Sequence, residues 1–86
     1  MPEISRFYGI VIRMYYNDHN PPHFHAHYSG REAVIDIRTL AVISGSLPAR
    51  ALGLVAEWAS LHSEELSDLW EQARNAEPLN RIDPLT

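Results

Sequence analysis

The sequence predicts an α+β fold in which two helices pack on one face of a three- or four-stranded antiparallel sheet. Residues 4–16 are rich in β-branched and aromatic side chains, a Ser29-Gly30 dipeptide separates two alternating segments, and apolar residues recur at helical spacing after Pro48. The 86 residues, of which 45% are apolar and 21% charged, suit one independently folding domain. We therefore expect a single domain across residues 1–86.

The first strand is predicted at residues 6–16, where the side chains alternate with the two-residue period of a half-buried strand. The alternating sets are Ile10, Ile12 and Met14 on one side and Val11, Arg13 and Tyr15 on the other. Residues 17–22 are expected to form a loop, because Pro21 and Pro22 lack backbone N–H donors and disfavour helix in the residues before them. This loop ends in a rigid segment that leads into the next strand.

A β-hairpin is predicted from strands at residues 23–28 and 32–38, joined by the Ser29-Gly30 turn. A two-residue turn determines which residues face each other, and side chains alternate between the two faces of a strand. One face is apolar and suits the core, so the three histidines of the hairpin should point outward. The expected pairs are His23 with Asp36, Phe24 with Ile35, His25 with Val34, Ala26 with Ala33, His27 with Glu32, and Tyr28 with Arg31. The pattern is also compatible with a short fourth strand at residues 40–43.

Two helices are predicted at residues 48–61 and 64–76, although the pattern also fits one kinked helix. Pro48 suits the first turn of a helix, where its missing N–H is not needed. Ser63 can cap the second helix, and the acidic residues after it complement the positive end of the helix dipole. An irregular tail follows at residues 77–86. The apolar positions are Ala51, Leu54, Val55, Trp58 and Leu61 in the first helix and Leu66, Leu69, Trp70 and Ala73 in the second.

The composition narrows the environment and the partners of the protein. There is no cysteine, which excludes disulfides and thiolate zinc sites and favours a cytoplasmic location. No apolar segment approaches the roughly 20 residues that a membrane span needs, so no membrane association is expected. The net charge is −4, with five arginines against four acidic residues in residues 1–50 and two against seven in residues 51–86. This charge disfavours nucleic-acid binding by the chain alone.

Four segments carry a resemblance to a known family: Arg6-Phe7-Tyr8-Gly9-Ile10, Asn17-Asp18-His19-Asn20-Pro21-Pro22-His23-Phe24-His25, Gly45-Ser46-Leu47-Pro48 and Glu57-Trp58. Together they resemble the prokaryotic family catalogued as domain of unknown function 4160, and the similarity extends from about Ile4 to Trp70. The resemblance implies an uncharacterised protein that is often encoded beside a second small protein, in an arrangement similar to toxin–antitoxin pairs. It implies no catalytic residues, so the chemistry has to be argued from the side chains.

The hairpin histidines suggest a site for zinc or another transition metal. His23 and His25 are two residues apart on a strand, so they point the same way with Cα atoms roughly 6 to 7 Å apart, close enough to share one ion. His27 lies about 13 Å from His23 along an extended strand, too far for shared ligation. A complete site needs a third ligand from the loop or from the opposite strand. The candidate ligands are Asp18, His19, His23, His25 and Asp36.

A second interpretation is acid–base chemistry without a metal. The ordinary pKa of histidine is about 6.5, so an imidazole can act as base or acid near neutral pH. Arg13 and Tyr15 share one face of the first strand, and they would flank the histidines if that strand pairs with the hairpin. We take His25, Arg13 and Tyr15 as the candidate catalytic residues for cleavage of an RNA phosphodiester.

A third interpretation needs no chemistry. The pairs His27 with Glu32 and His23 with Asp36 are ordinary cross-strand charge pairs on a solvated face. The leading functional hypothesis is a cytoplasmic component of a two-protein, toxin–antitoxin-like module that acts through protein contacts and, with a partner, nucleic-acid contacts. The alternatives are a small metal- or histidine-dependent phosphodiesterase or ribonuclease and a non-catalytic binding module. An open sheet face on so small a domain also favours association with a second copy.

Overall fold

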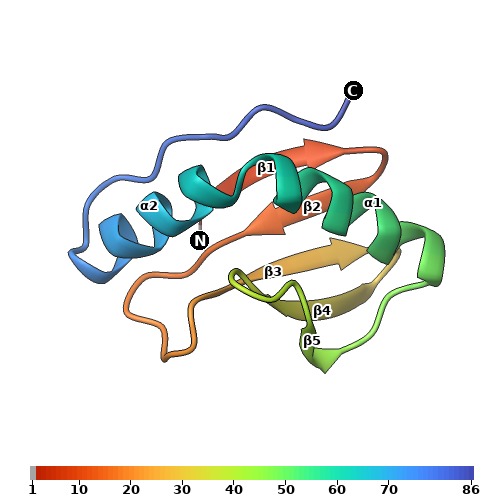
Figure 1. Ribbon diagram of the computed structural model, residues 1–86, viewed down its shortest axis with the longest axis horizontal. Coiled ribbons are helices and arrows are strands. Elements are labelled where there is room, and N and C mark those ends of the chain that lie inside the picture. The colour runs from red at the N-terminus through yellow and green to blue at the C-terminus, as the bar shows by residue number, and fades with distance from the viewer. Residues whose placement is uncertain (1) are drawn as a thin grey trace.

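The computed structural model describes residues 2–86, which form five antiparallel strands followed by two helices. The strands follow one another in the order β1-β2-β3-β4-β5, so the chain passes through the sheet as a meander before both helices cross one face (Figure 1). The predicted α+β class is confirmed. The elements are β1 (Glu3–Phe7), β2 (Ile10–Arg13), β3 (His23–Tyr28), β4 (Arg31–Asp36), β5 (Val42–Gly45), α1 (Ala49–Leu61) and α2 (Ser63–Arg74).

The predicted number of strands, three or four, is wrong because the expected strand at residues 6–16 is two strands. β1 and β2 are joined by a tight turn in which Tyr8 has a φ of 49° and Gly9 a φ of 79°. Such a turn needs the left-handed conformation at both central residues, which usually selects Asn, Asp or Gly. An aromatic residue at the first position instead favours a continuous strand in a sequence pattern. The sequence pattern therefore predicts no turn at Tyr8.

The β3–β4 hairpin has the predicted register at all six positions, from His23 opposite Asp36 to Tyr28 opposite Arg31. Ser29 and Gly30 take the two left-handed positions of the turn, with φ values of 51° and 78°. The predicted core face of the hairpin is buried, apart from partly exposed Tyr28 at its end. A two-residue turn and strict alternation leave no other register that buries these side chains.

The additional strand expected at residues 40–43 is β5, which begins later in the chain than the sequence pattern suggested. Leu40, with a φ of 62°, belongs to a turn in which its N–H donates to the carbonyl of Asp36, and β5 begins at Val42. The second helix, in contrast, begins one residue before the expected start at residue 64. Ser63 is already helical, and His62 occupies the cap position. The break at His62 gives two helices instead of one kinked helix.

The core lies between the sheet and the helices. Trp58 of α1 is fully buried, and its ring contacts the rings of Phe7 and Phe24 from two different strands. Trp70 of α2 is also buried, as expected for the apolar side of a helix. Within residues 2–86, no helix has the length and apolarity needed to cross a membrane.

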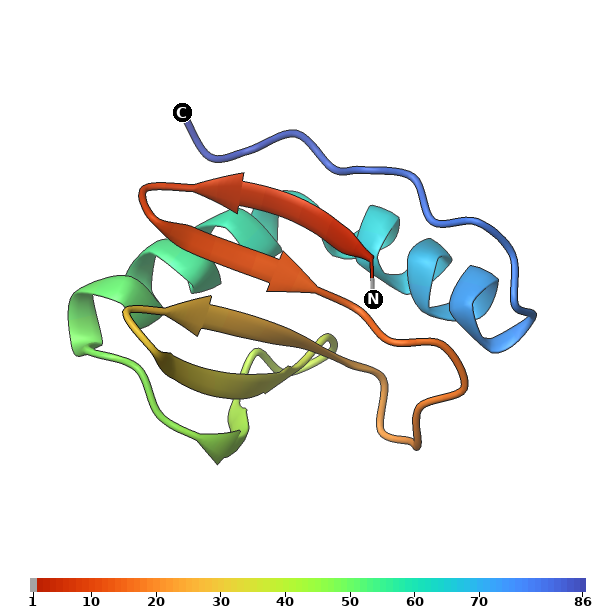
Figure 2. The same cartoon turned by 180° about the vertical axis from the view of Figure 1, so that it is seen from behind.

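The C-terminal tail runs along the β1 edge of the sheet. The N–H of Ile82 donates to the carbonyl of Ile4 at 2.7 Å, and the indole N–H of Trp58 donates to the carbonyl of Asp83 at 2.8 Å. The helices lie behind the sheet in the reverse view, so they leave its other face uncovered (Figure 2). His25 and His27 of β3 are half-buried on this uncovered face, whereas His23 lies at the end of the strand where the chain enters from the loop at residues 17–22.

Candidate metal centre

Three polar side chains meet where the loop enters β3. Asp18 folds back so that its Oδ2 lies 2.8 Å from Nε2 of His23 and 3.5 Å from Nε2 of His25. The three atoms that could bind an ion all lie within 4.8 Å of one another. The structure thus brings together the loop carboxylate and the two strand histidines that the spacing singled out.

The outer ring nitrogens of both histidines are already occupied. Nδ1 of His23 donates to the carbonyl of Pro21 at 2.7 Å, and Nδ1 of His25 donates to Oε2 of Glu32 at 3.2 Å. We assign the hydrogens to Nδ1 because a carbonyl and a carboxylate can only accept. Nε2 of each ring then faces the same oxygen of Asp18, which accepts a hydrogen bond from His23 or shares a bound ion with both rings. These electron-rich atoms repel one another unless a proton or a metal ion lies between them.

Asp18 supplies negative charge to the cluster. Burial raises the pKa of its carboxyl group, but the backbone N–H of His19, 2.9 Å from Oδ1, and the imidazole of His23 outweigh this effect, so the pKa lies below its ordinary value. The group is therefore a carboxylate at neutral pH. An ionised oxygen beside two imidazole nitrogens is a ligand set suited to a divalent cation.

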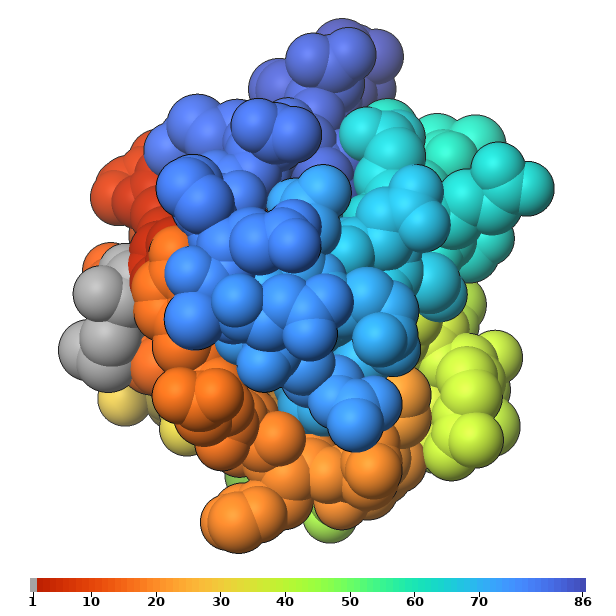
Figure 3. All heavy atoms as spheres, turned by 90° about the vertical axis from the view of Figure 1, so that its left-hand side faces the viewer, coloured from red at the N-terminus to blue at the C-terminus, as the bar shows by residue number. Residues whose placement is uncertain are grey.

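The expectation that the hairpin histidines point outward is wrong for His23. Its exposed fraction is 8%, and its ring centroid lies 5.1 Å from that of Trp70 on α2. His23 is the first residue of β3, where the loop and α2 close over the end of the strand. Figure 3 looks at this end of the molecule, where the orange loop lies against the blue helix. His25 and His27 are only half-buried, as their positions on the open face require.

The three candidate catalytic residues are neighbours. Arg13 of β2 lies directly opposite His25 in the β2–β3 register, and the ring of Tyr15 meets the His25 ring edge-on with centroids 4.4 Å apart. Arg13 forms no ion pair with any residue in 2–86. The imidazole of His25 therefore has a phenol and an available guanidinium beside it, as well as two carboxylates.

His19 lies outside the cluster. Its backbone N–H bonds to Asp18, but its side chain is exposed and is not among the ligand atoms that converge.

Asp36 also lies outside the cluster, although it faces His23 across the hairpin. Its Oδ1 accepts the backbone N–H groups of Arg38 at 2.7 Å and Thr39 at 3.1 Å. Burial raises the pKa of Asp36, but the hydrogen bonds from these two N–H groups lower it, and the net pKa lies below the ordinary value. Asp36 thus organises the turn after β4. Its sequence context, an aspartate two and three residues before the N–H groups it binds, is typical of such a turn.

Glu32 is the site residue that the sequence paired with His27 without connecting it to His25. The register pairs it with His27, yet its Oε2 forms a hydrogen bond with Nδ1 of His25 and lies 3.3 Å from Nε2 of His27 without forming one. Side chains on one sheet face also reach diagonal neighbours, and the contact between Glu32 and His25 is of this kind. The predicted register already contains this diagonal pair, so the contact is consistent with the sequence pattern.

The fold and the cluster define a small α+β domain with an Asp-His-His group at the entrance to an open antiparallel sheet. The chain belongs to the family described as domain of unknown function (DUF4160), whose model matches residues 9–71. The match confirms the resemblance carried by the sequence segments. Comparisons with curated proteins and with solved structures returned no match.

Proposed function

We propose that this protein binds a divalent transition-metal ion of the zinc type through Asp18, His23 and His25, and that the centre acts on a phosphodiester. One observation carries the proposal: each imidazole places Nδ1 beside an outer acceptor and Nε2 toward the same carboxylate oxygen. Histidines that bind metals characteristically hold an outer acceptor in this way. Three protein ligands leave a position for water, as in catalytic zinc sites.

The distances are compatible with this proposal. Ligand atoms in a tetrahedral zinc site lie about 3.4 Å apart when the bonds are about 2.1 Å long. The corresponding atoms here lie within 4.8 Å of one another, so small side-chain rotations would complete the site. Two imidazoles and a carboxylate, without a thiolate, suit zinc and other first-row divalent ions.

Arg13 and Tyr15 supply what a phosphodiester needs beside the ion. A guanidinium binds two phosphate oxygens at once, and Arg13 has no competing carboxylate within residues 2–86. The Tyr15 ring holds the His25 ring from the side, which keeps Nε2 in place. The ion, when bound, lowers the pKa of water and so supplies a nucleophile at neutral pH.

The same contacts support one second candidate, a ribonuclease without a metal. His25 has a carboxylate on each ring nitrogen, Glu32 on Nδ1 and Asp18 on Nε2. Such an imidazole can take a proton from a 2′-hydroxyl and return it to the leaving oxygen. A chelator separates the candidates, because cleavage that survives metal removal would require this second mechanism.

The metal proposal is tested on protein purified without a histidine tag. Elemental analysis and calorimetric zinc titration should give about one ion per chain, and the Asp18→Asn and His25→Gln variants should bind at least about 100-fold more weakly, because each lacks one of three ligands. His19→Gln is the matched control and should bind like the parent, since its ring lies outside the cluster. A parent protein that neither contains nor binds zinc, manganese, nickel or cobalt would show that the proposal is wrong.

We further propose that the protein works in the cytoplasm as one component of a two-protein, toxin–antitoxin-like module. The support is the family resemblance, together with an exposed row of acidic side chains on α2 that suits a basic partner: Glu64, Glu65, Asp68 and Glu71. The net charge of −4 implies that any nucleic-acid contact relies on that partner.

This role is tested by expression in a bacterial host. Growth arrest that the neighbouring gene relieves, and that folded Arg13→Ala and His25→Ala variants lose, is the expected result for an enzyme controlled by its partner. Harmless expression of the parent chain would contradict the toxin role.

A further inference from the structure

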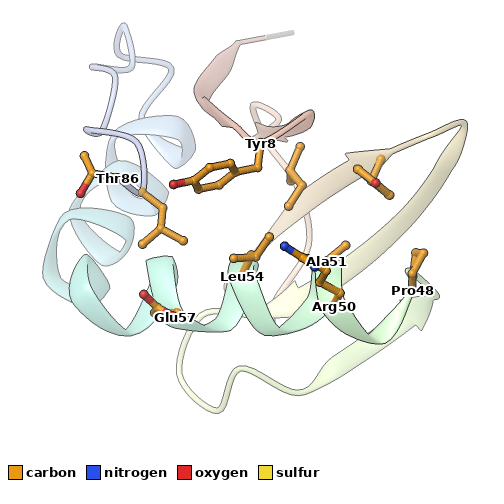
Figure 4. Close-up of a pocket in the computed structure, with 10 residues that line it drawn as sticks. Tyr8, Pro48, Arg50, Ala51, Leu54, Glu57 and Thr86 are labelled. Carbon is orange, nitrogen blue, oxygen red and sulfur yellow. The ribbon is translucent and has the colours of Figure 1, made fainter.

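A hollow of about 500 Å³ lies at the opposite end of the sheet from the metal centre. It is bounded by α1, the Tyr8-Gly9 turn and the end of the C-terminal tail (Figure 4). We call it the Tyr8 groove, lined principally by Tyr8, Ile10, Arg50, Leu54, Glu57 and Leu85. It shares no residue with the cluster of Asp18, His23 and His25.

The conformation of Tyr8 is the first observation that favours a binding site at the groove. The residue adopts a left-handed backbone with a φ of 49°, which is unfavourable for a bulky side chain, and it is 60% exposed. The equivalent position of the other hairpin holds the small residue Ser29. Burial within the chain therefore does not offset the backbone strain of an aromatic residue at Tyr8. Strain retained at an exposed position beside a hollow is typical of a binding site.

The second sign is the charge along α1. Arg50 and Glu57 both line the groove, and neither forms an ion pair with any residue in 2–86. They are seven residues apart, which corresponds to about 10 Å along a helix. Figure 4 shows Arg50 toward the Pro48 end and Glu57 toward the Thr86 end, with Leu54 between them. The groove thus has a positive end, an apolar middle and a negative end.

We propose that the Tyr8 groove binds an elongated small molecule with an apolar or aromatic body and an acidic group at one end. The acid lies at Arg50, the body lies between Tyr8 and Leu54, and the other end, near Glu57, accommodates hydrogen-bond donors. The volume of about 500 Å³ falls within the range of small-molecule sites. This inference is independent of the metal proposal, because the two sites share no side chain.

Two fluorescent probes with one ring system separate the apolar contact from the charged one. Anilinonaphthalene sulfonate is anionic, whereas phenylnaphthylamine has the same aromatic body without the acid. Both are titrated into the full chain, with circular dichroism and thermal melting to show that each variant is folded. The parent should bind both probes at one saturable site.

Four variants carry the test. Tyr8→Asn keeps a residue that favours the turn and removes the ring, so both probes should bind about tenfold more weakly. Arg50→Gln should weaken only the anionic probe, by about three- to tenfold, and Glu57→Gln should leave its affinity unchanged or raise it. Arg74→Gln, an exposed arginine on α2 that does not line the groove, is the control and should change neither affinity.

The inference would be overturned by the absence of saturable binding by the folded parent, by equal binding by a folded Tyr8→Asn variant, or by equal weakening of both probes by Arg50→Gln. Loss of probe binding in Asp18→Asn would also overturn it, because it would place the probe at the metal centre.

Discussion

The polar side chains at the two ends of the sheet differ in their burial and in their partners. At the loop end, Asp18, His23 and His25 are partly or fully buried and are hydrogen-bonded to one another and to the backbone. At the turn end, Arg50 and Glu57 are exposed and have no charged partner within residues 2–86. The first end is organised internally, whereas the second leaves its groups available to a ligand.

The difference in burial and pairing indicates what each end of the sheet is suited to do. Buried polar groups need partners, so the loop end holds its imidazoles in one geometry, as chemistry requires. Exposed groups around an apolar hollow cost little to leave unpaired and gain partners when a ligand arrives. We therefore propose that the loop end carries out chemistry and that the turn end recognises a ligand.

The largest expected effect is at the loop end, on the rate of phosphodiester cleavage. Arg13→Gln removes the guanidinium that would bind the phosphate, and kcat/KM for bis(p-nitrophenyl) phosphate should fall by about 10²- to 10³-fold. Zinc affinity should stay unchanged, because Arg13 is not a ligand. The matched control, Arg50→Gln at the turn end, should retain the parent rate, and an equal loss there would contradict the division.

The next effect is on metal affinity. Glu32→Gln removes the carboxylate that holds Nδ1 of His25, and zinc should bind about 10- to 100-fold more weakly in calorimetry. The same change at Glu57, in the Tyr8 groove, should leave zinc binding unaltered. If Glu32→Gln binds zinc as well as the parent, the contact with His25 has no role in holding a metal.

A smaller effect concerns folding at the turn end. Tyr8→Asn relieves a bulky residue of a left-handed backbone, so the free energy of unfolding should rise by about 0.5 to 1 kcal/mol in urea denaturation. Ser29→Asn, in the other hairpin, should give a smaller gain because serine is already tolerated there. A loss of stability in Tyr8→Asn would mean that the ring contributes to the fold and that its strain is already offset.

The smallest effect concerns the tail that forms one wall of the groove. Hydrogen bonds from Arg6 and Arg81 to Glu3 lower its pKa from 4.5 to about 2. A lowered folded pKa means that this contribution is present above pH 4.5 and is lost as the pH falls toward 2. Between pH 6 and about 2.5, the Tm of the parent should therefore fall slightly more than that of Glu3→Gln. Parallel Tm curves would show that Glu3 does not contribute.

The two hairpin turns show how far sequence patterns can go. Ser29-Gly30 predicts a turn because small residues that tolerate the left-handed region interrupt two alternating segments, and the six observed pairs follow from it. Tyr8-Gly9 makes the same kind of turn, but its aromatic residue favours a continuous strand in the sequence pattern despite the single glycine. That error changed the number of strands and also the core face before the turn, because Phe7 and Ile10, three residues apart, are both buried whereas Tyr8 is exposed.

The sequence by itself determined the α+β class and the register of the β3–β4 hairpin, whereas the grouping of His25 with Arg13 and Tyr15 also required the pairing of β2 with β3. The class and the register follow from short-range periodicity and from a turn of known length. Only the tertiary structure decided that Asp18 joins His23 and His25 while His19 and Asp36 do not, and that Trp70 covers His23. The path of a proline-containing loop and the docking of α2 settle those contacts. The Tyr8 groove likewise depends on packing, because α1 and the tail come from parts of the chain remote from Tyr8.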